Sequence, residues 1–114
     1  MAQDKNEFEF NIVLPAGSDW SQQFESTGTE LYIEFTGDAS FDGGTSTVAA
    51  YRTNGLSAQF GDTSQDQLSS VVVIAEETAH INSSNAAMTS KYFIVKYTAG
   101  DATAGNVEIN IWQP

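Results

Sequence analysis

The chain has 114 residues, no cysteine, and fifteen acidic side chains against four basic ones, for a net charge of −11. This length fits one domain, and the absence of cysteine excludes disulfide scaffolds and thiolate metal sites. The negative charge excludes a nucleic-acid or anionic-lipid surface, and the longest apolar run, five residues at 71–75, is too short to span a membrane.

Three segments alternate between apolar and polar residues with the period of two that is typical of a half-buried β-strand. These segments are residues 8–14, 31–35 and 107–111. Each is expected to turn its apolar residues toward a core and its mostly polar residues toward solvent.

Further strand patterns lie between these three segments. The pattern is clear at residues 92–97 and weaker at residues 20–24, 45–53, 56–60, 68–75 and 79–82. Trp20 and Phe24 are expected to point inward. The dipeptide Asn54-Gly55 is typical of a two-residue hairpin turn, because both residues tolerate positive φ. Residues 68–75 are apolar on both faces, which predicts a strand covered on both sides or at an interface. Residues 85–88 are compatible with a single helical turn.

Short strands at regular spacing, separated by Gly, Asp, Asn and Ser clusters, favour a sandwich or a barrel. The sequence therefore predicts an all-β protein, a single antiparallel β-sandwich of about eight strands with jelly-roll-like connectivity. The expected domain spans residues 7–114, and residues 1–6 are expected to form an N-terminal arm. The start of the chain lacks a basic end followed by an apolar stretch, so no secretory signal is predicted.

One acidic segment has the spacing of a calcium-binding loop. Asp38, Ser40 and Asp42 place oxygen-bearing side chains at alternate positions ahead of Gly43, which permits a sharp turn. The bidentate Glu that should follow is absent, because Ala49 occupies its position. Two interpretations remain, a calcium site or an acidic turn between strands, and no other cofactor is expected.

The residues that would support catalysis are few. Glu76, Glu77 and His80 are the only carboxylates and imidazole that lie close together in the sequence, and no G-x-S-x-G nucleophile elbow accompanies them. A surface or hydrogen-bonded histidine is the favoured interpretation of His80. The chain is therefore not expected to be an enzyme.

Five aromatic residues fall at positions expected to be polar or terminal: Trp20, Tyr32, Tyr51, Tyr92 and Trp112. Such residues cap the edge of a core, anchor a subunit interface, or stack on sugars. If the chain is a carbohydrate-binding module, the sugar-binding residues are expected to be Trp20, Tyr51 and Trp112.

The last third of the chain carries a recognisable pattern. Residues 90–97, a glycine-containing loop and residues 105–112 resemble the closing hairpin of small β-sandwich proteins of tailed bacteriophages. The alternating segment 8–14 and the segment 48–56, which ends in an Asn-Gly turn, fit the same layout. The chain thus resembles the capsid decoration (cement) proteins, although tail-fibre domains and carbohydrate-binding modules share this pattern.

The resemblance implies a structural virion protein that stabilises a phage capsid from outside by binding across neighbouring shell subunits. It implies a homotrimer on the outer capsid surface, the major capsid protein as partner, and no nucleic-acid or membrane partner. The alternative function is a carbohydrate-binding or tail-fibre receptor-binding module. The interface is expected to comprise Phe8, Phe10, Val71, Val73 and Trp112.

Overall fold

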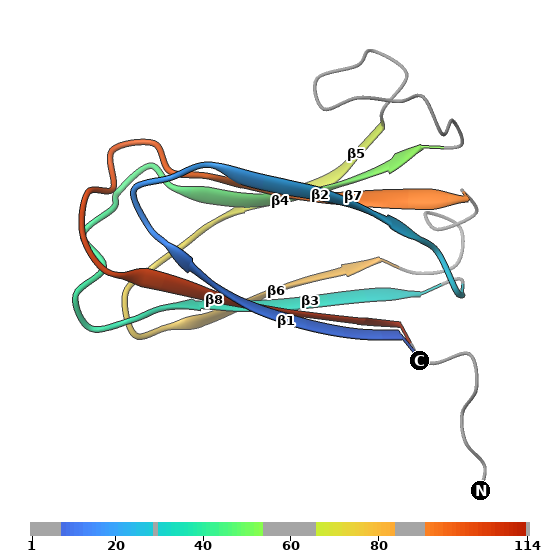
Figure 1. Cartoon of the computed structure of the whole chain (residues 1–114), viewed down its shortest axis with the longest axis horizontal. Coiled ribbons are helices and arrows are strands. Elements are labelled where there is room, and N and C mark those ends of the chain that lie inside the picture. Colours follow the sequence, from blue (N-terminus) through green and yellow to red (C-terminus); the bar gives the residue numbers. More distant parts are fainter. Residues whose placement is uncertain (1–7, 29, 54–65, 84–90, 114) are drawn as a thin grey trace, which may run out of the picture.

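The structure, a computed structural model, describes residues 8–28, 30–53, 66–83 and 91–113 (Figure 1). These residues form eight strands, and no helix occurs among them. None of the described residues belongs to a helix that could cross a membrane. The strands are β1 (Phe8–Pro15), β2 (Trp20–Glu25), β3 (Leu31–Gly37), β4 (Thr47–Thr53), β5 (Asp66–Val72), β6 (Thr78–Ser83), β7 (Tyr92–Thr98) and β8 (Asn106–Gln113).

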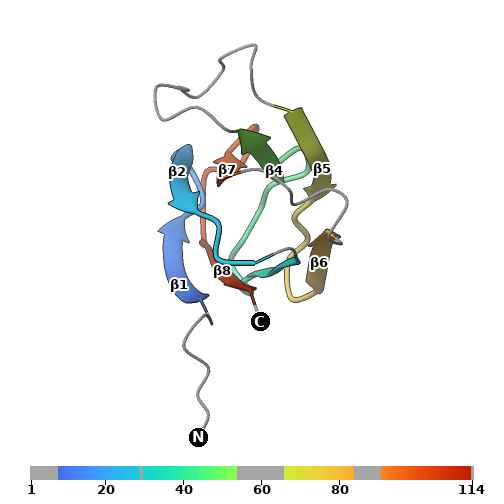
Figure 2. The ribbon, with the colours of Figure 1, turned by 90° about the vertical axis from the view of Figure 1, so that its right-hand side faces the viewer.

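The strands form two four-stranded antiparallel sheets that face each other, as the view along the strands shows (Figure 2). Sheet A has the order β1-β8-β3-β6 and sheet B the order β2-β7-β4-β5. The first strand pairs with the last, the second with the last but one, and so on: β1 with β8, β2 with β7, β3 with β6 and β4 with β5. Successive pairs alternate between the two sheets, which is the winding of a jelly roll. The predicted β-sandwich and its jelly-roll connectivity are therefore confirmed.

The core lies between the sheets and is built by the period-two alternation. Leu31, Ile33 and Phe35 on β3 are at most 1% exposed, and the residues between them are half-buried. Val107, Ile109 and Ile111 on β8 are buried in the same way. Sheet B supplies the other half of the core: Phe24, Val48, Ala50, Phe93, Val95 and Tyr97. Removing these apolar side chains from water is what drives the two sheets together.

The other strand predictions that fall on described residues are correct in kind but not always in extent. Residues 92–97 correspond to β7, and Trp20 and Phe24 on β2 both pack inward. In contrast, β5 ends at Val72, and the segment after it is not covered on both sides in the isolated chain. Val72 and Ile74 are 45% and 49% exposed. The predicted hairpin turn and return strand at 54–60, the helical turn at 85–88 and the N-terminal arm lie outside the described residues.

Candidate binding face on sheet A

One broad surface of the molecule combines aromatic, amide and carboxylate side chains. It is the side of sheet A that faces away from the core, and we call it the outer face of sheet A. Each strand contributes every second residue to it: Glu9, Asn11 and Val13 from β1; Glu108, Asn110 and Trp112 from β8; Tyr32, Glu34 and Thr36 from β3; Thr78, His80 and Asn82 from β6.

An aromatic pair lies at one end of this face. Tyr32 and Trp112 are register partners on β3 and β8, and their rings stack with centroids 5.6 Å apart and an interplanar angle of 21°. The Tyr32 hydroxyl donates a hydrogen bond to Oε1 of Glu30 over 3.0 Å. This hydrogen bond to a carboxylate, together with its negative charge, raises the pKa of Tyr32. Tyr32 is thus held both by the stacked Trp112 ring and by its hydrogen bond to Glu30.

Neighbouring side chains hold the carboxylates of this face in place. Nε2 of His80 lies 3.2 Å from Oε2 of Glu34, directly across the β3–β6 pair. The Asn11 amide donates to Oε2 of Glu108 over 3.0 Å and also to Oδ1 of Asn110. These contacts give the polar groups defined orientations. The prediction that His80 has a hydrogen-bonding role is confirmed, and its partner is Glu34, which is remote in sequence.

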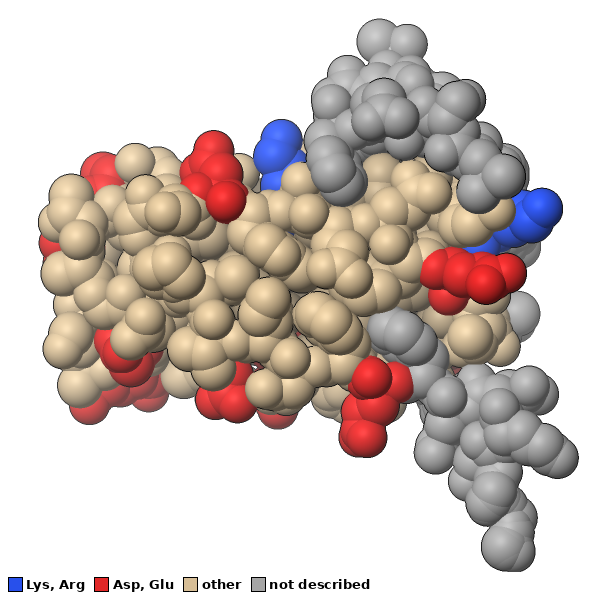
Figure 3. Space-filling view, in the orientation of Figure 1, with Lys and Arg blue, Asp and Glu red and all other residues tan. Residues whose placement is uncertain are grey.

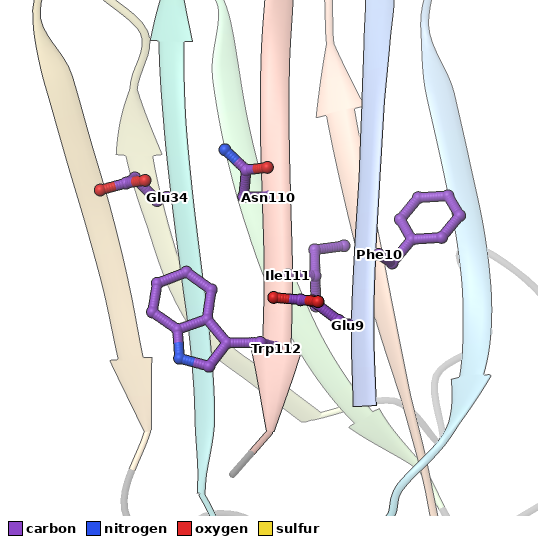
Figure 4. A pocket seen from close by; sticks show the side chains of 6 residues that line it. All are labelled: Glu9, Phe10, Glu34, Asn110, Ile111 and Trp112. Carbon is purple, nitrogen blue, oxygen red and sulfur yellow. The ribbon is translucent and has the colours of Figure 1, made fainter. Parts of the chain in front are cut away.

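A hollow of about 330 Å³ lies beside the aromatic pair, over β1, β8 and β3 (Figure 4). Its volume is at the lower end of the range for ligand pockets, about 300–1,000 Å³. In the close-up, the Trp112 indole extends from β8 toward β3, and Asn110 and Glu34 stand next to it. The lining residues are Glu9, Phe10, Glu34, Asn110, Ile111 and Trp112.

The charges of the molecule are distributed unequally between its two sheets. In Figure 3 acidic side chains appear along the lower edge, beside sheet A, and also on the side of sheet B, whereas the basic side chains appear beside sheet B alone. Among the described residues every Lys and Arg lies on or next to a strand of sheet B: Arg52, Lys91 and Lys96. Sheet A therefore presents a face whose formal charge is negative.

The three predicted sugar-binding aromatic residues do not form one site. Trp112 lies on the outer face of sheet A. Tyr51 lies on sheet B, next in sequence to the inward-facing Ala50. Trp20 packs against the core, with its ring 6.3 Å from that of Phe10. The sequence marks Tyr32 as an aromatic residue at a polar position but does not pair it with Trp112, because the pairing depends on the register of β3 and β8.

The predicted interface residues also do not lie together on one surface. Val73 is 1% exposed and belongs to the core, so its assignment to an exposed interface is wrong for the isolated chain. Val71 is partly buried and faces the same way, because side chains alternate along the strand. Phe10 is partly buried and contacts the ring of Phe24 at 5.0 Å. The side chain of Phe8 lies outside the described residues, which leaves Trp112 as the predicted residue on an open face.

The predicted calcium ligands hold the ends of loops together. Oδ1 of Asp38 accepts a hydrogen bond from the Ser40 backbone N–H, and Oδ2 accepts one from the Asn106 amide, each over 3.1 Å. Asp42 accepts hydrogen bonds from the loop between β7 and β8. Such bonds to the charged form lower the pKa values of both aspartates, that of Asp42 to about 2. No group of three or more acidic, His or Cys side chains is placed to hold a metal within the part of the chain that the structure describes.

Comparisons with known proteins are sparse. No protein-family model matches the chain, and no curated protein matches it. Among solved structures, one from work on Bacillus endospore appendages, described as a family of disulfide-linked pili, is similar over 98% of this chain and 95% of that chain. The two share 13% sequence identity with a TM-score of 0.46.

Proposed function

We propose that this protein is a structural subunit that binds the outside of a tailed-phage capsid as a homotrimer and stabilises the shell. The observation that carries the proposal is the apolar free edge of sheet B. Within the part of the chain that the structure describes, β5 pairs with β4 on one side only. Val72, its last residue, and Ile74, two residues further on, are about half exposed. We call Val72 and Ile74 the β5 apolar pair.

An edge strand with exposed aliphatic side chains is a surface to which a neighbouring chain can bind favourably. The open backbone groups of such a strand accept a further strand or loop, and apolar contacts add about 25 cal/mol for each Å² buried. Both members of the β5 apolar pair come from the same short segment, so one neighbour can cover both. The proposed contact thus lies at β5, one residue to either side of the buried Val73.

The ends of the chain support a second contact. Phe8, the first residue of β1, lies opposite Gln113, the last residue of β8, so β1 begins and β8 ends at the same end of sheet A. The proposed arm, residues 1–6, would start beside Trp112, whose register partner on β1 is Glu9. In this proposal the arm contacts a neighbouring subunit or the major capsid protein, and the outer face of sheet A stays exposed.

The proposed role needs no catalysis and no nucleic-acid or membrane contact. A net charge of −11 would keep decorated particles apart in solution through mutual repulsion. In this proposal the protein lies on the outer capsid surface, with the acidic outer face of sheet A pointing away from the shell.

Light scattering of the purified protein at micromolar concentration tests the trimer. The expected mass is three times the chain mass of 12.3 kDa. In the double variant Val72→Ser, Ile74→Ser the mass is expected to fall to that of a monomer. Val13→Ser, which changes a 57% exposed valine on β1, is the matched control and should remain trimeric. A monomeric wild-type protein would contradict the trimer.

Shell binding is tested separately with heads of a tailed phage that were assembled without the protein. Added wild-type protein should sediment with the heads and raise the temperature at which they release DNA. A variant that lacks residues 1–6 should bind more weakly. If the wild-type protein neither sediments with the heads nor protects them, the decoration role is wrong even where a trimer forms.

A further inference from the structure

The hollow on the outer face of sheet A has an aromatic wall. The Trp112 indole is half-buried and is supported by the stacked Tyr32 ring. The face of an indole carries negative charge density, and the C–H groups on one side of a pyranose ring carry slight positive charge. A ring fixed by a stacked neighbour offers that contact at little cost in side-chain entropy.

Polar groups with unused hydrogen-bonding capacity stand next to the indole (Figure 4). Asn110 uses Oδ1 to accept a hydrogen bond from Asn11, and Nδ2 of Asn110 has no partner among the described residues. Glu34 uses Oε2 for His80, and its Oε1 likewise has no partner in this part of the chain. A donor and an acceptor are thus available side by side, which is the pattern that a pair of neighbouring sugar hydroxyls satisfies.

These groups are oriented before any ligand arrives. Asn11 holds the Asn110 amide, and His80 holds the Glu34 carboxylate at 3.2 Å. Both contacts run between neighbouring strands of one sheet, so each side chain has a partner on the adjacent strand. Sites whose polar groups are already oriented suit ligands that need directional hydrogen bonds, because less side-chain entropy is lost on binding.

We propose that this hollow is a binding site for a neutral saccharide, with Trp112 as the stacking platform and Asn110 and Glu34 as hydrogen-bonding groups. The site does not include the β5 apolar pair of sheet B, whose substitution tests the proposed trimer. It would give a particle-bound protein a glycan-binding surface that points outward.

Charge determines the class of saccharide. Glu9 and Glu34 line the hollow, and sheet A carries no Lys or Arg among its described residues. Sulfated, phosphorylated or uronic-acid sugars are therefore repelled. The side-chain ammonium and guanidinium groups of a basic peptide only donate hydrogen bonds, whereas one sugar hydroxyl can both donate to Glu34 and accept from the Asn110 N–H.

The test is isothermal titration calorimetry of the whole chain against defined probes at millimolar concentration. The neutral probes are the linear hexasaccharides of maltose, cellulose, mannan and chitin type. A heparin hexasaccharide is the anionic probe, and hexalysine is the cationic probe. At least one neutral hexasaccharide is expected to bind, and the heparin fragment and hexalysine are not.

Variants then locate the site. Trp112→Ala is expected to weaken binding at least about tenfold, as truncation of an aromatic anchor does. Asn110→Ala and Glu34→Gln are expected to weaken it several-fold, and they keep the test valid if Trp112→Ala is poorly folded. Tyr51→Ala, which removes an aromatic residue from sheet B, is the matched control and should bind like the wild type. Thermal unfolding of each variant checks that the fold is intact.

Three results would overturn the proposal. One is that none of the four neutral hexasaccharides binds. A second is that binding survives Trp112→Ala and Asn110→Ala but is lost in Tyr51→Ala, which would put the site on sheet B. The third is that hexalysine binds in place of the sugars, which would make the face a docking surface for a basic partner. None of these outcomes bears on the mass of the assembly, so the proposed trimer is tested apart from the saccharide site.

Discussion

The carboxylate of Asp42 accepts hydrogen bonds from both the backbone N–H and the hydroxyl of Thr103, over 2.8 Å and 2.6 Å. It also accepts one from the Ala104 N–H over 3.0 Å. Asp42 belongs to the connection between β3 and β4, and Thr103 to that between β7 and β8. One side chain therefore ties together two loops that are about sixty residues apart in sequence.

This arrangement predicts a loss of stability in acid. Hydrogen bonds from Thr103 and Ala104 lower the pKa of Asp42 from 3.8 to about 2, and similar bonds lower the pKa values of Asp38 and Asp101. A depressed folded-state pKa contributes stability that is complete above the unfolded-state value and is lost as pH falls through the folded-state value. The free energy of unfolding from urea titrations should therefore be flat above pH 5 or so and decline between about pH 4 and pH 2.

Substitutions separate the contribution of Asp42 from general acid effects. Asp42→Asn keeps an oxygen for the backbone N–H groups but cannot ionise, so its unfolding free energy should be lower at neutral pH and decline less in acid. Glu77→Gln is the control, because Glu77 is exposed and its carboxylate accepts no hydrogen bond among the described residues. Equal acid slopes for the wild type and Asp42→Asn would contradict this account.

Gln113 closes the other end of the sandwich. Its side chain is fully buried, and Oε1 accepts a hydrogen bond from the Thr27 N–H over 2.8 Å. Its Nε2 donates to the carbonyl oxygen of Glu30 over 2.9 Å. The amide thus fastens the connection between β2 and β3 to the last residue of β8.

Loss of this amide should be costly. Gln113→Ala leaves the Thr27 N–H and the Glu30 carbonyl without these partners and opens a cavity, so we expect it to lower the free energy of unfolding by about 2–3 kcal/mol. Glu108→Ala, at an exposed position on the same strand, should change it by no more than about 0.5 kcal/mol. Chemical denaturation measures both, and similar values for the two variants would show that the amide is not a stabilising contact.

The sequence was informative where one face of a strand is buried. Alternation at 31–35 and 107–111 predicts the inward faces of β3 and β8, because turning these residues outward would expose the apolar side chains that form the core. Val73 shows the limit of this reasoning. In a continuous run of apolar residues the sequence does not indicate which side chains point inward, so the burial of Val73 depends on how β5 lies against β4. The β5 apolar pair is the other half of the same run.

The candidate binding face was beyond sequence reasoning for a related reason. Tyr32 and Trp112 lie eighty residues apart, and their contact exists because β3 and β8 pair in one register among several that the polar pattern allows. The pair Glu34 and His80 depends equally on the register of β3 and β6. Local patterns predict which way each side chain points, whereas the jelly-roll winding decides which strands lie together.

Gly105 is a position where no other residue fits. Its φ of 90° is unfavourable for any side chain, and an added Cβ would lie 2.4 Å from the Phe41 backbone nitrogen. We therefore expect Gly105→Ala to lower the free energy of unfolding by about 2–3 kcal/mol, from backbone strain and displacement of Phe41. Gly44→Ala is the matched control, because its Cβ would meet nothing closer than Asp101 at 3.4 Å. Thermal unfolding should give a lower melting temperature for Gly105→Ala than for Gly44→Ala. A small effect of Gly105→Ala would mean that the loop can rearrange.

Calcium should leave the stability of this protein unchanged. The oxygens of Asp38 and Asp42 that a cation would need already accept hydrogen bonds from Ser40, Asn106 and the loop after β7. Binding to the folded state would raise the free energy of unfolding, by about 2.7 kcal/mol at a hundredfold excess over Kd. The melting temperature is therefore expected to be the same in millimolar calcium as in a chelator. A rise in calcium that disappears in the Asp42→Asn variant would instead establish a metal site between the two loops and would mean that the Thr103 contacts give way to the ion.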